Sequence, residues 1–123
     1  MPVRDPFEKA ESDLKNLVAR NLPGRGQTKK FYVLLSEIVK RILEAAYGIQ
    51  TAEQTTIEIM ESLDRQPGLP RENREIVESF LLRCDIVKFA KYVPSEGENN
   101  AAVENAFHIL KLGSDKNKLL TDN

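Results

Sequence analysis

Apolar residues recur every three or four positions along most of this chain, which is the spacing of one face of an α-helix. The longest periodic stretch begins at Thr28, and Gly48 follows its last turn. Its apolar face consists of Phe31, Leu34, Leu35, Ile38, Ile42, Leu43 and Ala46. Because glycine readily takes the left-handed conformation that ends helices, the pattern predicts a helix from Thr28 to about residue 47. No long run alternates strictly between apolar and polar residues, so no sheet is expected.

Capping residues indicate where other helices begin. Thr55 and Glu58 have the spacing of a capping box, and so do Ser95 and Glu98. In such a box each side chain accepts a hydrogen bond from a backbone N–H of the first helical turn that would otherwise lack a partner. The first box predicts a short helix, and the second predicts a helix that ends at Gly113.

Two more helices complete the predicted set. Asp5 can cap a helix that should stop near Asn21, before a proline–glycine turn. Another helix should begin at about Arg71, after a second such break, and carry Cys84 on its apolar face. We expect Asp85 to end that helix by capping a short separate turn.

These elements predict an all-α fold, a single compact bundle of about five helices with no sheet. The helical domain should cover residues 5–113. We expect residues 1–4 to be a disordered N-terminus and residues 114–123 to be a disordered, mostly polar C-terminal tail.

The composition excludes several kinds of chemistry. The chain has 123 residues, with 18 Lys and Arg against 19 Asp and Glu, and a net charge of −1. Nucleic-acid binders usually have a basic excess, so a helix-turn-helix regulator that binds nucleic acid is only an alternative. One Cys and one His cannot build a Cys/His zinc cluster, and no metal or cofactor site is expected.

The second alternative is an enzyme that uses Cys84 with His108. A catalytic thiol needs a nearby base, and His108 is the only histidine in the chain. Nothing in the sequence places the two residues together or supplies a third group to orient them. We therefore expect a non-enzymatic protein, in which Cys84 acts as a small buried apolar residue.

One local feature departs from the balanced charge. Residues 24–30 form a glycine-rich basic loop before the longest predicted helix. The loop lacks the Gly-Lys-Ser/Thr ending of a phosphate-binding P-loop. The commoner explanation of such a loop is a flexible turn with a solvated basic patch, and the alternative is docking to an acidic partner or to anionic lipid head groups. Its positive charge lies at the positive end of the helix dipole, and this small cost weakly favours a reason other than stability. The candidate partner-binding residues are Arg25, Lys29 and Lys30.

Four segments, 31–43, 46–49, 54–59 and 81–90, occur in an order that resembles the cytoplasmic C-terminal region of BatD-type proteins, the Bacteroides aerotolerance group. The shared succession is Phe-Tyr, a leucine-rich stretch, Tyr-Gly, Thr-x-x-Glu and Cys-Asp-x-x-Lys-Phe-Ala. The signature positions in this chain, to which we assign structural roles, are Tyr47, Gly48, Thr55, Glu58, Cys84, Asp85, Lys88 and Phe89.

The resemblance implies a scaffold at the cytoplasmic side of the bacterial inner membrane, acting in envelope assembly or stress tolerance. BatD-like proteins are encoded beside MoxR-type AAA+ ATPases and von Willebrand A-domain proteins, which makes these the expected protein partners. The resemblance carries over no catalytic residue. Any membrane attachment is expected only through a segment absent from this chain, because the longest uncharged runs are far shorter than a bilayer span.

Overall fold

The computed structural model describes residues 5–121 and contains five α-helices, with no strand in that range. A short 3₁₀ turn, η1, precedes the second helix. The elements are α1 (Pro6–Ala19), η1 (Pro23–Arg25), α2 (Thr28–Tyr47), α3 (Thr56–Asp64), α4 (Arg71–Phe89) and α5 (Glu96–Thr121). The predicted all-α bundle of about five helices is confirmed.

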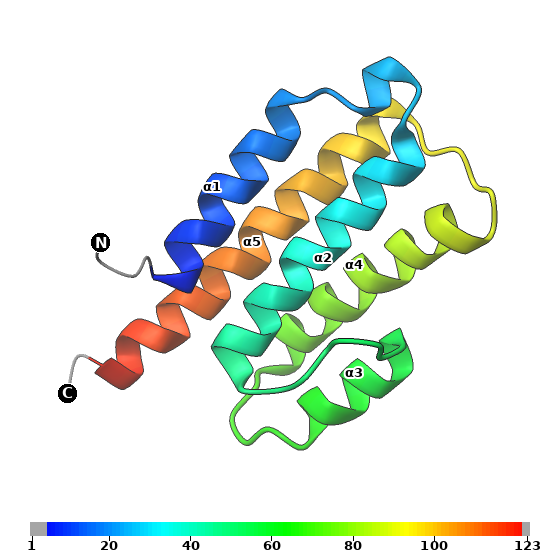
Figure 1. Cartoon of the computed structure of the whole chain (residues 1–123). Helices are drawn as coiled ribbons and strands as arrows, with labels where there is room; N and C mark the ends of the chain where they lie inside the picture. The colour runs from blue at the N-terminus through cyan, green and yellow to red at the C-terminus, as the bar shows by residue number, and fades with distance from the viewer. Residues whose placement is uncertain (1–4, 122–123) are drawn as a thin grey trace.

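Four long helices, α1, α2, α4 and α5, lie side by side, and the short α3 packs against α4 at one end (Figure 1). Successive long helices run in opposite directions along the bundle. The helix α2 contacts α1, α4 and α5, so it is the central element of the core. Its buried Tyr32 donates a hydrogen bond to Asn99 Oδ1 of α5 at 2.7 Å. This bond satisfies the hydroxyl that burial would otherwise leave without a partner.

The predicted caps are confirmed. Asp5 accepts a hydrogen bond from the backbone N–H of Phe7 at 2.7 Å. Thr55 and Glu58 form the reciprocal bonds of a capping box, at 3.0 and 3.2 Å. Ser95 and Glu98 do the same at 3.0 and 3.1 Å. These side-chain acceptors fix the starts of α1, α3 and α5, because they satisfy N–H groups that have no partner within the helix.

The predicted break at Asp85 is wrong, because α4 is one continuous helix to Phe89. Cys84 and Val87 are buried on either side of that position, so core contacts hold both turns of the helix in place. Asp85 does not cap its own helix. Its Oδ2 accepts a hydrogen bond from the Thr56 hydroxyl at 2.6 Å, across to the start of α3.

The predicted helix end at Gly113 is also wrong, because α5 continues to Thr121. A Cβ at Gly113 would lie 3.0 Å from Ala46 Cβ and 3.3 Å from Phe7 Cε1, so this glycine allows close packing of α5 on α2 and α1. Beyond it, Lys116 Nζ donates to the Ala46 carbonyl at 3.1 Å. The expected disorder of residues 114–123 is therefore wrong for 114–121, while 122–123 and 1–4 lie outside the described residues.

Candidate interaction surface

The outward side of α4 carries large apolar side chains that no other element covers. Three of them are spaced four and three residues apart, so they share one face of the helix, and two more follow in the loop to α5. We call this set the α4 face; it consists of Leu82, Ile86, Phe89, Tyr92 and Val93. Phe89 is 78% exposed and Val93 is 82% exposed. Contiguous exposed apolar side chains of this kind are typical of protein interaction sites.

The helix α4 is therefore apolar on two sides. Its inner side packs into the core through Val77, Phe80, Leu81, Cys84 and Val87. The inner residues are required for folding, since they fill the bundle. The outer residues are not part of the core, so the packing of the bundle interior does not account for them.

A shallow hollow of about 670 Å³ lies along the α4 face, where α4 meets the start of α5. Its apolar lining comes from Leu82, Ile86 and Tyr92. The Tyr92 hydroxyl donates to the Glu98 carboxylate, at 2.8 and 2.9 Å to the two oxygens, and this bond raises the pKa of Tyr92. Arg83 lies 4.0 Å from the same carboxylate. The aromatic ring is thus held at the edge of the hollow.

Charge changes sign from one end of the α4 face to the other. Glu75 and Glu78 line the hollow near the start of α4. Each forms an exposed ion pair along the helix, with Arg71 at 3.2 Å and Arg74 at 3.6 Å, and such pairs are weak. At the other end, Lys91 is exposed just after α4 and forms no ion pair among residues 5–121. The face therefore has an acidic end and a basic end.

The predicted basic residues lie near the basic end of the α4 face. Arg25 in η1, and Lys29 and Lys30 in the first turn of α2, are exposed and form no ion pair within the described part of the chain. A groove of about 580 Å³ is lined both by the loop that carries Arg25 and by Val93 of the α4 face. The three cations flank this groove without lining it. Figure 1 shows the start of α2 at the same end of the bundle as the α4–α5 connection.

Buried and partly buried polar groups join α2, α3 and α4 around two signature residues. Asp85 binds the Thr56 hydroxyl, and Lys88 Nζ lies 3.9 Å from Asp85 Oδ1. Lys88 also donates to Ser36 Oγ at 3.3 Å. Burial lowers the pKa of Lys40, and the positive charge of Lys88 lowers it further. Asp85 and Lys88 each have a hydrogen-bond partner on another helix, so the cluster fixes the three helices relative to one another.

Other signature residues lie at helix ends. Gly48 ends α2 with a φ of 67°, and Tyr47 before it is buried, with Lys116 Nζ 5.4 Å from its ring centroid. Burial raises the pKa of Tyr47. Thr55 and Glu58 form the cap of α3, and the hydrogen bond from the Thr55 backbone lowers the pKa of Glu58. The signature residues thus do not converge on one site.

Phe89 differs from the other signature residues, because it is exposed and belongs to the α4 face. Lys88 Nζ lies 5.3 Å from its ring centroid. This cation–π contact orients the ring while leaving most of it accessible.

The Cys84 thiol is 1% exposed, and burial raises its pKa to about 12. His108 is exposed on α5, and no hydrogen bond joins it to Cys84 among residues 5–121. A thiol that stays protonated and inaccessible is poorly suited to nucleophilic attack.

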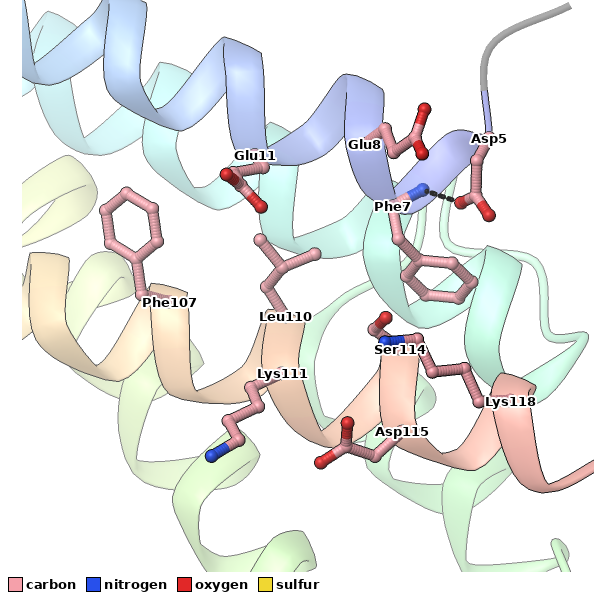
Figure 2. A pocket seen from close by; sticks show the side chains of 10 residues that line it. All are labelled: Asp5, Phe7, Glu8, Glu11, Phe107, Leu110, Lys111, Ser114, Asp115 and Lys118. Carbon is pink, nitrogen blue, oxygen red and sulfur yellow. Dashed lines mark hydrogen bonds between the residues drawn. The ribbon is translucent and has the colours of Figure 1, made fainter.

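Another hollow, of about 480 Å³, lies between α1 and α5 (Figure 2). Phe7 and Leu110 form its apolar part, and carboxylates including Glu8 and Glu11 lie at its edge. Hydrogen bonding to Lys15 lowers the pKa of Glu11. Within residues 5–121, no group of three or more His, Cys, Asp or Glu side chains is placed to hold a metal ion.

The α4 face is not among the predicted sites, although the sequence contains a signal for it. Leu82, Ile86 and Phe89 follow helical spacing on the side opposite Cys84. The predicted break at Asp85 assigned the last two to a separate turn, so the second apolar stripe of one helix was divided.

No protein-family model matches this chain, and no curated protein or solved structure matches it either. None of the helices in the described range has both the length and the hydropathy that spanning a bilayer requires.

Proposed function

We propose that this chain is a non-enzymatic protein-interaction domain that docks a partner on the α4 face. The observation that carries the proposal is the exposure of five large apolar side chains on one helix and its following loop, with Phe89 at the centre. Covering these side chains is favourable, because each Å² of apolar surface removed from water contributes about 25 cal/mol of free energy. Aromatic residues surrounded by polar groups are typical of the residues that dominate binding energy at interfaces.

The resemblance to BatD-type tails supports a partner of the MoxR-type ATPase or von Willebrand A-domain class, at the cytoplasmic side of a bacterial membrane. We propose that Arg25, Lys29 and Lys30 form a basic rim that meets acidic residues of this partner. Their lack of internal ion pairs supports this role, since they are free to bind an external carboxylate. The burial of Cys84 supports a structural role for that residue and disfavours the thiol enzyme.

The α4 face is tested by measuring binding to a purified MoxR-type ATPase and a purified von Willebrand A-domain protein from the same genome. We expect the double substitution Leu82→Ser and Phe89→Ser to weaken binding at least tenfold, because interface aromatics contribute more than about 1.4 kcal/mol. The matched control is Ile57→Ser on α3, which removes an apolar residue that is 69% exposed from another helix. Equal binding by the double variant and the wild type would remove the α4 face from the proposal.

The basic rim is tested separately with Arg25, Lys29 and Lys30 all changed to Glu. We expect slower association that depends on salt, since rim charges act mainly on the encounter rate. The matched control changes Lys15, Arg65 and Lys111 to Glu, which alters the net charge equally at other exposed positions. Equal association rates for the two triple variants would show that net charge, and not a rim, is responsible.

A further inference from the structure

The occupant of the α4 face must match both its apolar centre and its charged ends. The apolar stripe runs along one helix, so a second helix is the element that covers it best. The side chains of Glu75 and Glu78 are 60% and 40% exposed at one end, and Lys91 is exposed at the other. A covering helix should therefore carry basic charge over the two glutamates and acidic charge over Lys91.

The helix α4 of a second copy has this charge order when it runs in the opposite direction. We propose, going beyond the proposed function, that the α4 face binds the α4 face of a second copy when no other partner covers it, with the two helices antiparallel across a twofold axis. A twofold interface uses the same patch on both copies, so an apolar centre with oppositely charged ends is self-complementary.

The spacing of the side chains fixes the register. Leu82 and Ile86 lie on either side of the midpoint of the apolar stripe on α4. The twofold axis passes between them, so Leu82 of each copy contacts Ile86 of the other copy. Ser79 and Phe89 are equally far from that axis, so each Phe89 ring lies over the small Ser79 of the other copy. This pairing places a large side chain against a small exposed one, which permits close packing of the helices.

The same register brings Glu78 of each copy near Lys91 of the other. Glu78 is 40% exposed, and its present partner is Arg74, which also pairs with Asp64. Releasing Glu78 therefore leaves Arg74 with a carboxylate. The proposed contact occurs twice, once at each end of the helix pair, and both contacts are on the solvent-exposed edge.

The proposed interface consists of one helix and part of a loop from each copy. Interfaces of this small size are typical of weak complexes, so we expect self-association that depends on concentration. The equilibrium should be measured by sedimentation velocity from about 5 to about 500 μM, a range suited to weak association. Phe89→Glu should remain monomeric throughout, because it places a charge within the apolar interface, over Ser79 of the other copy.

A charge exchange tests the antiparallel register. Glu78→Lys alone puts lysine opposite Lys91, and Lys91→Glu alone puts glutamate opposite Glu78, so each variant should self-associate about tenfold more weakly than the wild type. Mixing the two variants restores opposite charges at both ends of a mixed dimer. We expect the mixture to dimerise as the wild type does. Circular dichroism of each variant checks that the bundle is intact.

The outcomes separate this inference from the proposed function. A wild type that stays monomeric, together with partner binding that Phe89→Ser abolishes, would overturn the second copy and leave the α4 face as a docking surface for another protein. Dimerisation that both charge reversals leave unchanged, or that each reversal weakens without recovery in the mixture, would overturn the antiparallel register. A monomeric wild type whose partner binding is unaffected by Phe89→Ser would overturn both proposals.

Discussion

Cys84 and Phe89 lie five residues apart on the same helix and have opposite surroundings. Cys84 is enclosed by the core, where the neutral thiol is favoured because burial penalises the thiolate. Phe89 is in water although it is the more apolar side chain. Residue type alone therefore does not decide burial in α4. The position around the helix decides it.

The buried thiol makes stability depend on alkaline pH. In the unfolded chain Cys84 ionises near its ordinary pKa of 9.0, whereas in the folded protein its pKa is about 12. Between these values the unfolded state binds fewer protons, so the free energy of unfolding falls as pH rises, and below pH 9 the thiol contributes no slope. We expect Cys84→Ala to flatten the dependence measured by urea unfolding at pH 8 and pH 10.5.

A residual slope should remain in that variant. Burial also raises the pKa of Tyr32, to about 12 from 10.0, so this hydroxyl contributes over the upper part of the same range. Tyr32→Phe in the Cys84→Ala background should remove much of the remainder. An unchanged slope in Cys84→Ala would show that the thiol ionises equally in both states.

At the scale of elements, α4 is held on one side by the core and tied to α3 through the Thr56–Asp85 hydrogen bond. The starts of α1, α3 and α5 could be predicted because a cap involves residues within a few positions of each other. The continuity of α4 could not be predicted, because the residue that donates a hydrogen bond to Asp85 lies 29 positions earlier. An aspartate without a visible partner has the local properties of a helix cap.

We expect Thr56→Val to destabilise the protein by about 1–3 kcal/mol, because it leaves the half-buried Asp85 carboxylate without its donor. Thr56→Ser keeps the hydroxyl and loses only a methyl group, so it should cost less. The two variants are compared by thermal and urea unfolding. Equal losses in both would show that the contribution of Thr56 comes from packing rather than from the hydrogen bond.

At the scale of the whole molecule, α5 is the helix that closes the bundle against α1, α2 and α4. At Gly113 this helix packs closely against Ala46 of α2 and Phe7 of α1. From the sequence, a glycine followed by polar residues is typical of a helix end. Its role as a contact point follows only from the packing, as does the exposure of the α4 face.

We expect Gly113→Leu to destabilise the fold by at least about 1–3 kcal/mol, because the added side chain meets atoms already in close contact. Leucine is a better helix former than glycine, so helix propensity opposes this loss. The control is Gly97→Leu in the first turn of the same helix, where a Cβ meets only Ser95 Oγ, at 3.9 Å. Urea unfolding of both variants measures the difference. Equal stability would contradict the close approach of α5.

The placement of the three tyrosines gives the molecule an optical property. The chain has no tryptophan, so tyrosine dominates its near-ultraviolet absorption and emission. Tyr32 and Tyr47 are buried, whereas Tyr92 is 45% exposed and bound to a carboxylate. A water-soluble quencher or a solvent perturbation therefore acts mainly on Tyr92. Because this ring lies within the α4 face, the protein carries its own spectroscopic label at the surface that we propose is covered on binding.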